Sequence, residues 1–198
     1  MKKTLILVSI LLFTQFLLCQ NKKEIVFMNV NDEVITRKEF KSFDKKRSYI
    51  TEIENDTALI KKVSSRKQLG LLDSVKHRQV KIILSKIIGS EFNGNKNIMI
   101  HLYDSNTAKI KDDIENERYW SWIKKNSHKF QSYLIGTKNS KINVDSENHL
   151  FLDQYDILKN LFFRNSKFLI NHLFIKPNGE VFIYNGEEDI LFILDWSV

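Results

Sequence analysis

The chain has one cysteine, Cys19, and residues 20–198 contain no thiol. That long segment therefore cannot form a disulfide within itself, a thiolate nucleophile or a cysteine-ligated metal site. Proline occurs once and glycine six times, and we find no low-complexity run, internal repeat, G-x-S-x-G or G-x-x-x-x-G-K motif. The scarcity of breakers predicts a compact chain without a flexible linker, and it gives no support to a phosphate-cradling loop.

The first nineteen residues have the pattern of an export signal. Lys2 and Lys3 precede an apolar run over residues 4–18, and a polar run begins at Gln20. The run is too short for a good membrane span, so we predict a signal peptide over residues 1–19 with cleavage near Cys19 or Gln20. This places the protein in the periplasm, the cell envelope or the extracellular space. Two alternatives stay open, namely lipidation of Cys19, which would tether the protein to a membrane, and an uncleaved anchor.

The charge balance is basic but dispersed. The chain has 31 lysines and arginines against 24 acidic residues, a formal net charge of +7. Its basic pairs stand apart and are followed by acidic or apolar residues, as expected of a solvated surface. We therefore predict no nucleic-acid partner, and contact with a membrane only through a lipid on Cys19.

Residues 21–92 read as an N-terminal α+β extension. A strand is predicted over residues 25–30, and Thr36 with Glu39 forms a capping box that starts a short helix. Apolar and β-branched runs at 48–53 and 58–63 predict a hairpin. The apolar spacing from Gln68 to Ile88 predicts one long helix, which Gly89 would end.

Residues 95–198 alternate between strand and helix patterns. Strands are predicted at 98–103, 131–136, 168–175 and 180–184, and the last two are joined by a tight turn over 177–179. A charged helix is predicted over 112–125. A second helix, capped by Asp153, is predicted from apolar residues at i, i+4, i+7 and i+11 from Phe151 to Phe162. The final run, 190–194, fits a helix or a strand.

This order resembles the thioredoxin fold over residues 95–198. The strand–turn–strand from Asn171 to Glu180 is similar to the third and fourth strands of that family. The resemblance implies an α/β protein with a four-stranded mixed sheet flanked by helices. It fails at the family's chemical positions: Thr107 and Ile110 stand where two cysteines would open the first helix, and Asn171 stands in place of the cis-proline. We expect a trans peptide bond there.

The former redox position is the predicted binding groove. Ligands of open α/β sheets sit beyond the carboxyl ends of the strands, so Asp104, Thr107, Ile110 and Asn171 are expected to line it. Trp120 and Trp122 point about 200° apart on a helix, so they cannot share a face. We select Trp122, which Arg118 and Lys125 flank, as the aromatic residue that meets a partner.

The sequence favours binding over catalysis. The five histidines are far apart and none has the spacing of a zinc site, so no metal, cofactor or catalytic residue is predicted. We expect a redox-inactive, non-covalent binding module for an unknown protein or peptide, and a chaperone-like or toxin-neutralising role is equally compatible. The alternative is a small secreted hydrolase that uses His and Asp or Glu residues from distant segments.

The absence of thiols gives a direct prediction. The chain without residues 1–19 should reduce a disulfide substrate only at the background rate in a thiol-coupled assay, because no atom in it can form a mixed disulfide. Turnover above background would show that the protein is not redox-inactive.

Overall fold

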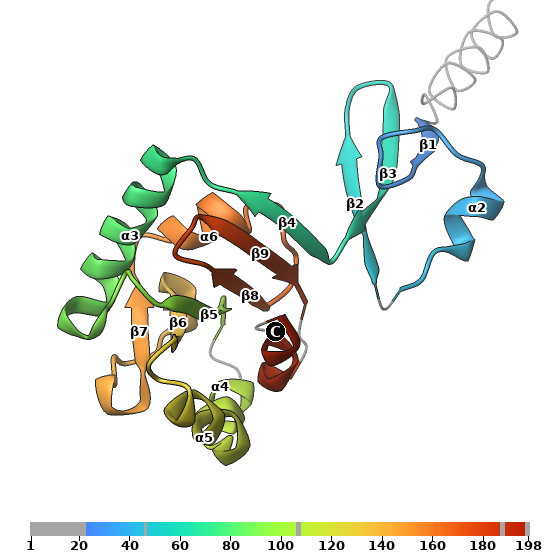
Figure 1. The fold of residues 1–198 in the computed structure, drawn as a ribbon. Helices are drawn as coiled ribbons and strands as arrows, with labels where there is room; N and C mark the ends of the chain where they lie inside the picture. Colours follow the sequence, from blue (N-terminus) through green and yellow to red (C-terminus); the bar gives the residue numbers. More distant parts are fainter. Residues whose placement is uncertain (1–22, 46, 106–107, 187–188, 197–198) are drawn as a thin grey trace, which may run out of the picture. The chain divides into compact units, whose positions relative to one another are not determined.

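The computed structural model describes residues 23–45, 47–105, 108–186 and 189–196, and the predicted signal peptide with Cys19 lies outside them. The chain forms two compact units, residues 1–65 and 66–198. The predicted α/β class is confirmed, because each unit combines helices with a mixed sheet (Figure 1). Within the described residues, no helix is both long enough and apolar enough to cross a membrane.

The first unit is a three-stranded sheet with one short helix. Its elements are β1 (Glu24–Met28), α2 (Arg37–Ser42), β2 (Ser48–Glu54) and β3 (Ala58–Ser65). The strand order is β1-β3-β2, with β1 parallel and β2 antiparallel to β3, so the predicted hairpin is confirmed. The capping box is also confirmed: the Glu39 N–H donates to the Thr36 hydroxyl at 3.2 Å, and the Thr36 N–H donates to the Glu39 carboxylate at 2.8 Å.

The second unit is built on a six-stranded sheet in the order β4-β9-β8-β5-β6-β7. The strands are β4 (Lys67–Leu71), β5 (Asn97–Tyr103), β6 (Phe130–Thr137), β7 (Leu150–Asp153), β8 (Ile170–Ile175) and β9 (Glu180–Asn185). The four predicted strands are β5, β6, β8 and β9, and they are neighbours in the middle of the sheet. The sheet thus has two strands more than predicted, β4 at one edge and β7 at the other.

Helices cover both faces of this sheet. The α-helices are α3 (Ser74–Ile88), α4 (Ala108–Ile114), α5 (Glu117–Lys125) and α6 (Ile157–Phe162), and the 3-10 helices are η1 (Gly89–Glu91), η2 (Lys138–Ser140), η3 (Ser146–Asn148) and η4 (Ile190–Trp196). Buried residues of α3 and α6 pack with alternate sheet residues such as Ile100 and Ile135. The other alternate residues, such as Met99 and Leu134, pack with α4, α5 and η4. The side-chain period of two therefore divides the core into two layers (Figure 1).

Residues 66–92 belong to the second unit and not to the N-terminal extension assigned to 21–92. The predicted helix from Gln68 is correct only from Ser74, where the Asp73 carboxylate accepts the Lys76 N–H at 2.8 Å. Before that cap, residues 67–71 form β4 and pair antiparallel with β9. The helical spacing of their leucines was misleading because sheet pairing outweighs a weak local pattern.

Two further helix predictions are corrected. The charged helix over 112–125 is two helices, α4 and α5, because the Asn116 side chain accepts the Tyr119 N–H at 3.0 Å and starts α5 anew. The helix over 151–162 is wrong in its first half: Phe151 lies in β7, and α6 begins only at Ile157. Asp153 nonetheless accepts the Leu158 N–H at 2.7 Å, so its carboxylate holds the helix start from the end of the strand. The final segment, left open between helix and strand, is the 3-10 helix η4.

Gly136 in β6 has no room for a side chain. A Cβ atom there would overlap the Ser140 and Ile142 side chains. We predict that Gly136→Ala lowers the free energy of unfolding by about 1–3 kcal/mol, as overpacking does elsewhere. Urea denaturation would measure it. The control is Gly70→Ala in β4, where the nearest atom lies 3.2 Å away at Val181; an equal loss at both positions would contradict the steric account.

Candidate functional site

Three residues of the predicted groove, Asp104, Ile110 and Asn171, have partners within the second unit. Asp104 accepts the Thr137 hydroxyl at 2.9 Å and pairs with Lys159 at 2.5 Å. Ile110 is buried in the core. The buried Asn171 accepts the Ser166 hydroxyl at 2.6 Å and donates to the Phe168 carbonyl at 3.1 Å. The peptide bond at Asn171 is trans, as expected.

Trp122 and Thr107 complete the predicted set. Trp122 packs on Phe130 with ring centroids 5.0 Å apart, and Thr107 lies outside the described residues. None of the four described residues of the set lines the cleft that the second unit has beside α5.

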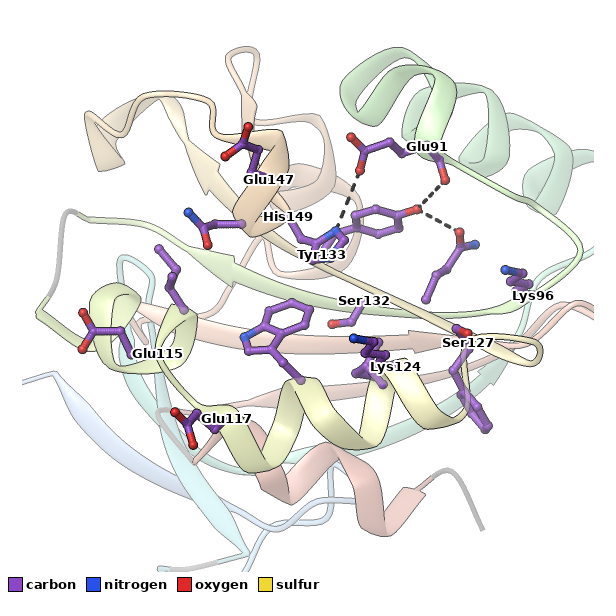
Figure 2. A pocket seen from close by; sticks show the side chains of 16 residues that line it. Glu91, Lys96, Glu115, Glu117, Lys124, Ser127, Ser132, Tyr133, Glu147 and His149 are labelled. Atoms are coloured by element: carbon purple, nitrogen blue, oxygen red, sulfur yellow. Dashed lines mark hydrogen bonds and ion pairs between the residues drawn. The ribbon is translucent and has the colours of Figure 1, made fainter.

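That cavity is a cleft of about 710 Å³ beside α5 (Figure 2). Its apolar lining comes from Trp120 and Ile123 on α5 and from Phe130 and Tyr133 on β6. Ile114 lines the cleft as well. Charged and polar side chains surround these residues, among them Glu91, Lys96, Glu115, Glu117, Lys124, Ser127, Glu147, Asn148 and His149. An apolar floor with a polar rim is the usual composition of a ligand site.

The cleft exists because β7 covers only half of β6. Pairing with β7 begins at Leu134, whose N–H donates to the His149 carbonyl at 2.9 Å. His149 has φ 55°, in the left-handed region, so the chain turns away there, and among the described residues no strand pairs with residues 130–133 on that side. Ser132 and Tyr133 point to opposite faces of the sheet, yet both line the cleft. The cleft therefore lies at the edge of β6 itself.

An aromatic pair forms part of the cleft wall. The Trp120 ring stacks on the His149 ring with centroids 5.0 Å apart and planes 22° from parallel. The Trp120 indole N–H donates to the Asp113 carbonyl at 2.9 Å, which fixes the ring to the end of α4. His149 also lies 3.8 Å from the Glu91 carboxylate. These contacts hold a flat aromatic surface in the cleft before any ligand arrives.

A chain of hydrogen bonds leads from the cleft into the core. The Ser132 hydroxyl lies 2.6 Å from the Tyr119 hydroxyl, which lies 2.8 Å from His101 Nε2. His101 Nδ1 then meets His172 Nδ1 at 2.7 Å across the β5–β8 pairing. All four residues are buried. The His101 imidazole thus contacts Tyr119 and not the Ser132 hydroxyl, which differs from the direct serine–histidine contact of a nucleophilic site.

This chain has two complete proton arrangements. If His101 Nδ1 carries the proton, it donates to His172, Tyr119 donates to His101 Nε2, and Ser132 donates to Tyr119. If His172 Nδ1 carries it, every bond reverses, and the Ser132 hydroxyl proton becomes free to donate into the cleft. The Ser132 oxygen can therefore present either an acceptor or a donor to a ligand.

Burial sets the titration of this layer. It lowers the pKa of His101 well below 6.5, and the neighbouring His172 and Lys109 act in the same direction. Burial likewise raises the pKa of Tyr119 far above the usual value of a phenol. His101 and Tyr119 are therefore neutral at pH 7, and a proton added to His101 would be a buried charge.

A second buried polar group lies next to the first. The Tyr103 hydroxyl donates to Asp113 at 2.7 Å, and the Lys109 ammonium lies 3.1 Å from the other carboxylate oxygen. Burial raises the pKa of Asp113, although both partners favour its charged form. Asp113 joins this group to the cleft, because its backbone carbonyl holds the Trp120 ring.

Sequence analysis missed Trp120, Ser132, His149 and the His101–His172 pair. The histidine pair had a usable signal, since each histidine is central in a predicted strand and antiparallel pairing of those strands aligns them. The cleft has none, because the apolar spacing from Phe151 to Phe162 predicts a helix and conceals the position at which β7 begins. No group of three or more His, Cys, Asp and Glu side chains suited to a metal ion occurs among the described residues. In comparisons with known proteins, no family model and no curated protein matches this chain.

The buried imidazole predicts acid sensitivity. The unfolded chain binds a proton at His101 near pH 6.5 whereas the folded chain does not, so stability should fall as the pH drops below 6.5. One such group contributes at most about 1.4 kcal/mol per pH unit. We predict that His101→Asn removes up to this much of the slope of unfolding free energy between pH 6.5 and 5.

Urea denaturation at several pH values measures that slope, and His128→Asn is the control because His128 is exposed. A slope unchanged by His101→Asn, but changed by His128→Asn, would show that the buried pair is not its source.

Proposed function

We propose that this protein is an exported, redox-inactive protein of the thioredoxin-like fold that binds an extended peptide segment without covalent chemistry. The cleft at the uncovered edge of β6 is the proposed binding site. The observation that carries the proposal is that one cleft combines an edge of sheet, an aromatic wall and an adaptable hydroxyl group.

The arrangement of the middle strands supports the thioredoxin-like part of the proposal. The order β6-β5-β8-β9, with β5 and β6 parallel and β8 and β9 an antiparallel pair, is similar to the four-stranded core of that family. The position of the family's cysteines carries none here. A binding role that does not need a thiol is therefore compatible with this sheet, although fold alone does not fix function.

The geometry of the edge favours an extended ligand. In a parallel pair, alternate residues direct their backbone groups to the same side, and Leu134 bonds to the β7 side. Ser132, two residues earlier, therefore directs its N–H and C=O toward the cleft. Backbone groups at a sheet edge are the usual hydrogen-bonding partners of an added peptide strand.

The cleft walls supply what such a strand needs besides backbone hydrogen bonds. Trp120 and Ile123 offer apolar surface to a side chain on one face, and Tyr133 offers it on the other. Aromatic residues of this kind carry much of the affinity in peptide and protein interfaces. The histidine–carboxylate contact at the cleft, His149 with Glu91, keeps a hydrolytic role testable beside binding.

The experiment is a screen of the full chain against a library of four-residue peptides, acetylated and amidated at their ends, read by native mass spectrometry. We expect retained, intact peptides. Trp120→Ala should weaken the retained peptides at least tenfold, because it removes the aromatic wall. Trp122→Ala is the matched control, since it lies two residues away on α5 and packs on Phe130.

Three results would overturn this proposal. Retention of no peptide would reject the cleft as a peptide site. An equal loss of affinity in both tryptophan variants would place binding elsewhere. Peptide fragments that disappear with Ser132→Ala or His149→Ala would favour the hydrolase.

A further inference from the structure

Apart from Glu91, which pairs with His149, the acidic and basic side chains that line the cleft lie toward its two opposite ends. Glu115, Glu117 and Glu147 gather at the end where α5 begins, and Lys96 and Lys124 lie toward the end where α5 finishes (Figure 2). The whole chain is basic, so an acidic end is not a consequence of composition. The separation of acidic from basic side chains is therefore a local feature of the cleft.

The α5 helix explains only part of this pattern. Acidic residues at a helix start and basic residues at its end are favoured by the helix dipole, which accounts for Glu117 and Lys124. Glu147 lies in η3 and Lys96 lies just before β5, on the side of the cleft away from α5 (Figure 2). These two residues repeat the same order of charges although the dipole of α5 does not act on their placement. Each side of the cleft thus carries one acidic and one basic end.

Most of these charges remain available to a ligand. Within the described part of the chain, Glu117, Glu147, Lys96 and Lys124 take part in no ion pair, and Glu115 is shared only with the exposed Lys111 at 3.8 Å. The Glu91 carboxylate, by contrast, faces His149. Exposed charges without an internal partner can be neutralised by a bound group without breaking an existing contact.

The helix sets the spacing of the two ends. Seven residues separate Glu117 from Lys124, which corresponds to about 10 Å along a helix that rises about 1.5 Å per residue. An extended peptide covers the same length in three steps of about 3.3 Å. The first and fourth side chains of such a peptide point to opposite sides of the cleft. Because each side of the cleft has an acidic and a basic residue, each of the two side chains meets a residue of opposite charge whichever side it faces.

Resting on the proposed function, we propose that the cleft selects a short extended peptide segment with opposite charges three residues apart. The basic side chain lies among Glu115, Glu117 and Glu147, and the acidic side chain lies beside Lys96 and Lys124. The two residues between them contact Trp120, Ile123 and the edge of β6.

Calorimetric titration of the full chain with four capped peptides tests this selection. All four have two central leucines, and their first and fourth residues are lysine and glutamate, two lysines, two glutamates or two glutamines. The lysine–glutamate peptide should bind about threefold to tenfold more tightly than the other three, since each exposed ion pair contributes modestly. Raising the salt concentration should reduce this difference.

A charge reversal makes the test specific. In the variant Lys96→Glu with Lys124→Glu, the peptide with two lysines should become the tightest of the four. The matched control is Lys38→Glu with Lys41→Glu in α2, which makes the same change in net charge outside the cleft and should leave the order unchanged. Equal affinity for all four peptides, or the same order after the reversal, would overturn the charge selection while peptide binding stands. Failure of every peptide in both this titration and the library screen would overturn the proposed function as well.

Discussion

β6 is paired with β5 from Phe130 to Gly136 but with β7 only from Leu134 onward. This unequal pairing is the constraint on which the site depends. It follows from the left-handed backbone at His149, which ends the approach of the chain toward β6 and starts β7 late. A longer β7 would fill the space between α5 and η1 with its own backbone. The same turn places the His149 ring against Trp120, so it both opens the edge and supplies part of the wall.

The layer beneath the cleft is unusually polar for a core. His172, His101 and Ser132 lie in strands and face the layer that holds α5, where Tyr119 lies. Hydrogen bonds link them in the order His172, His101, Tyr119, Ser132. Such a network is stable only while its members are satisfied and neutral, because an uncompensated buried charge is costly. The hydrogen-bonded groups that connect the core to the cleft therefore include His101, the group that lowers the stability of the protein at acidic pH.

Elements whose signal lies in adjacent residues could be predicted from the sequence. Elements that form only by pairing with a distant strand could not. The capping box at Thr36, the stop at Gly89 and the middle strands carry their information in adjacent residues, and all are found. β4 and β7 have helical apolar spacing and become strands only because β9 and β6 offer unpaired edges. The candidate site depends on where β7 begins, and the helical apolar spacing of residues 151–162 conceals that position. Helix geometry correctly indicates that Trp120 and Trp122 lie on different faces of α5. Which of the two faces lines the cleft depends on tertiary packing, and it is the face of Trp120.

The reversible direction of the Ser132 hydrogen bonds has a consequence for recognition. A ligand that offers a carbonyl and a ligand that offers an amide proton each favour one of the two hydrogen-bond patterns. The choice passes from Ser132 through Tyr119 to the pair of imidazoles, His101 and His172. The preference between such ligands is then not a property of the serine alone. It includes the difference in free energy between the two tautomers of the His101–His172 pair, so residues that no ligand touches help to decide which ligand is retained.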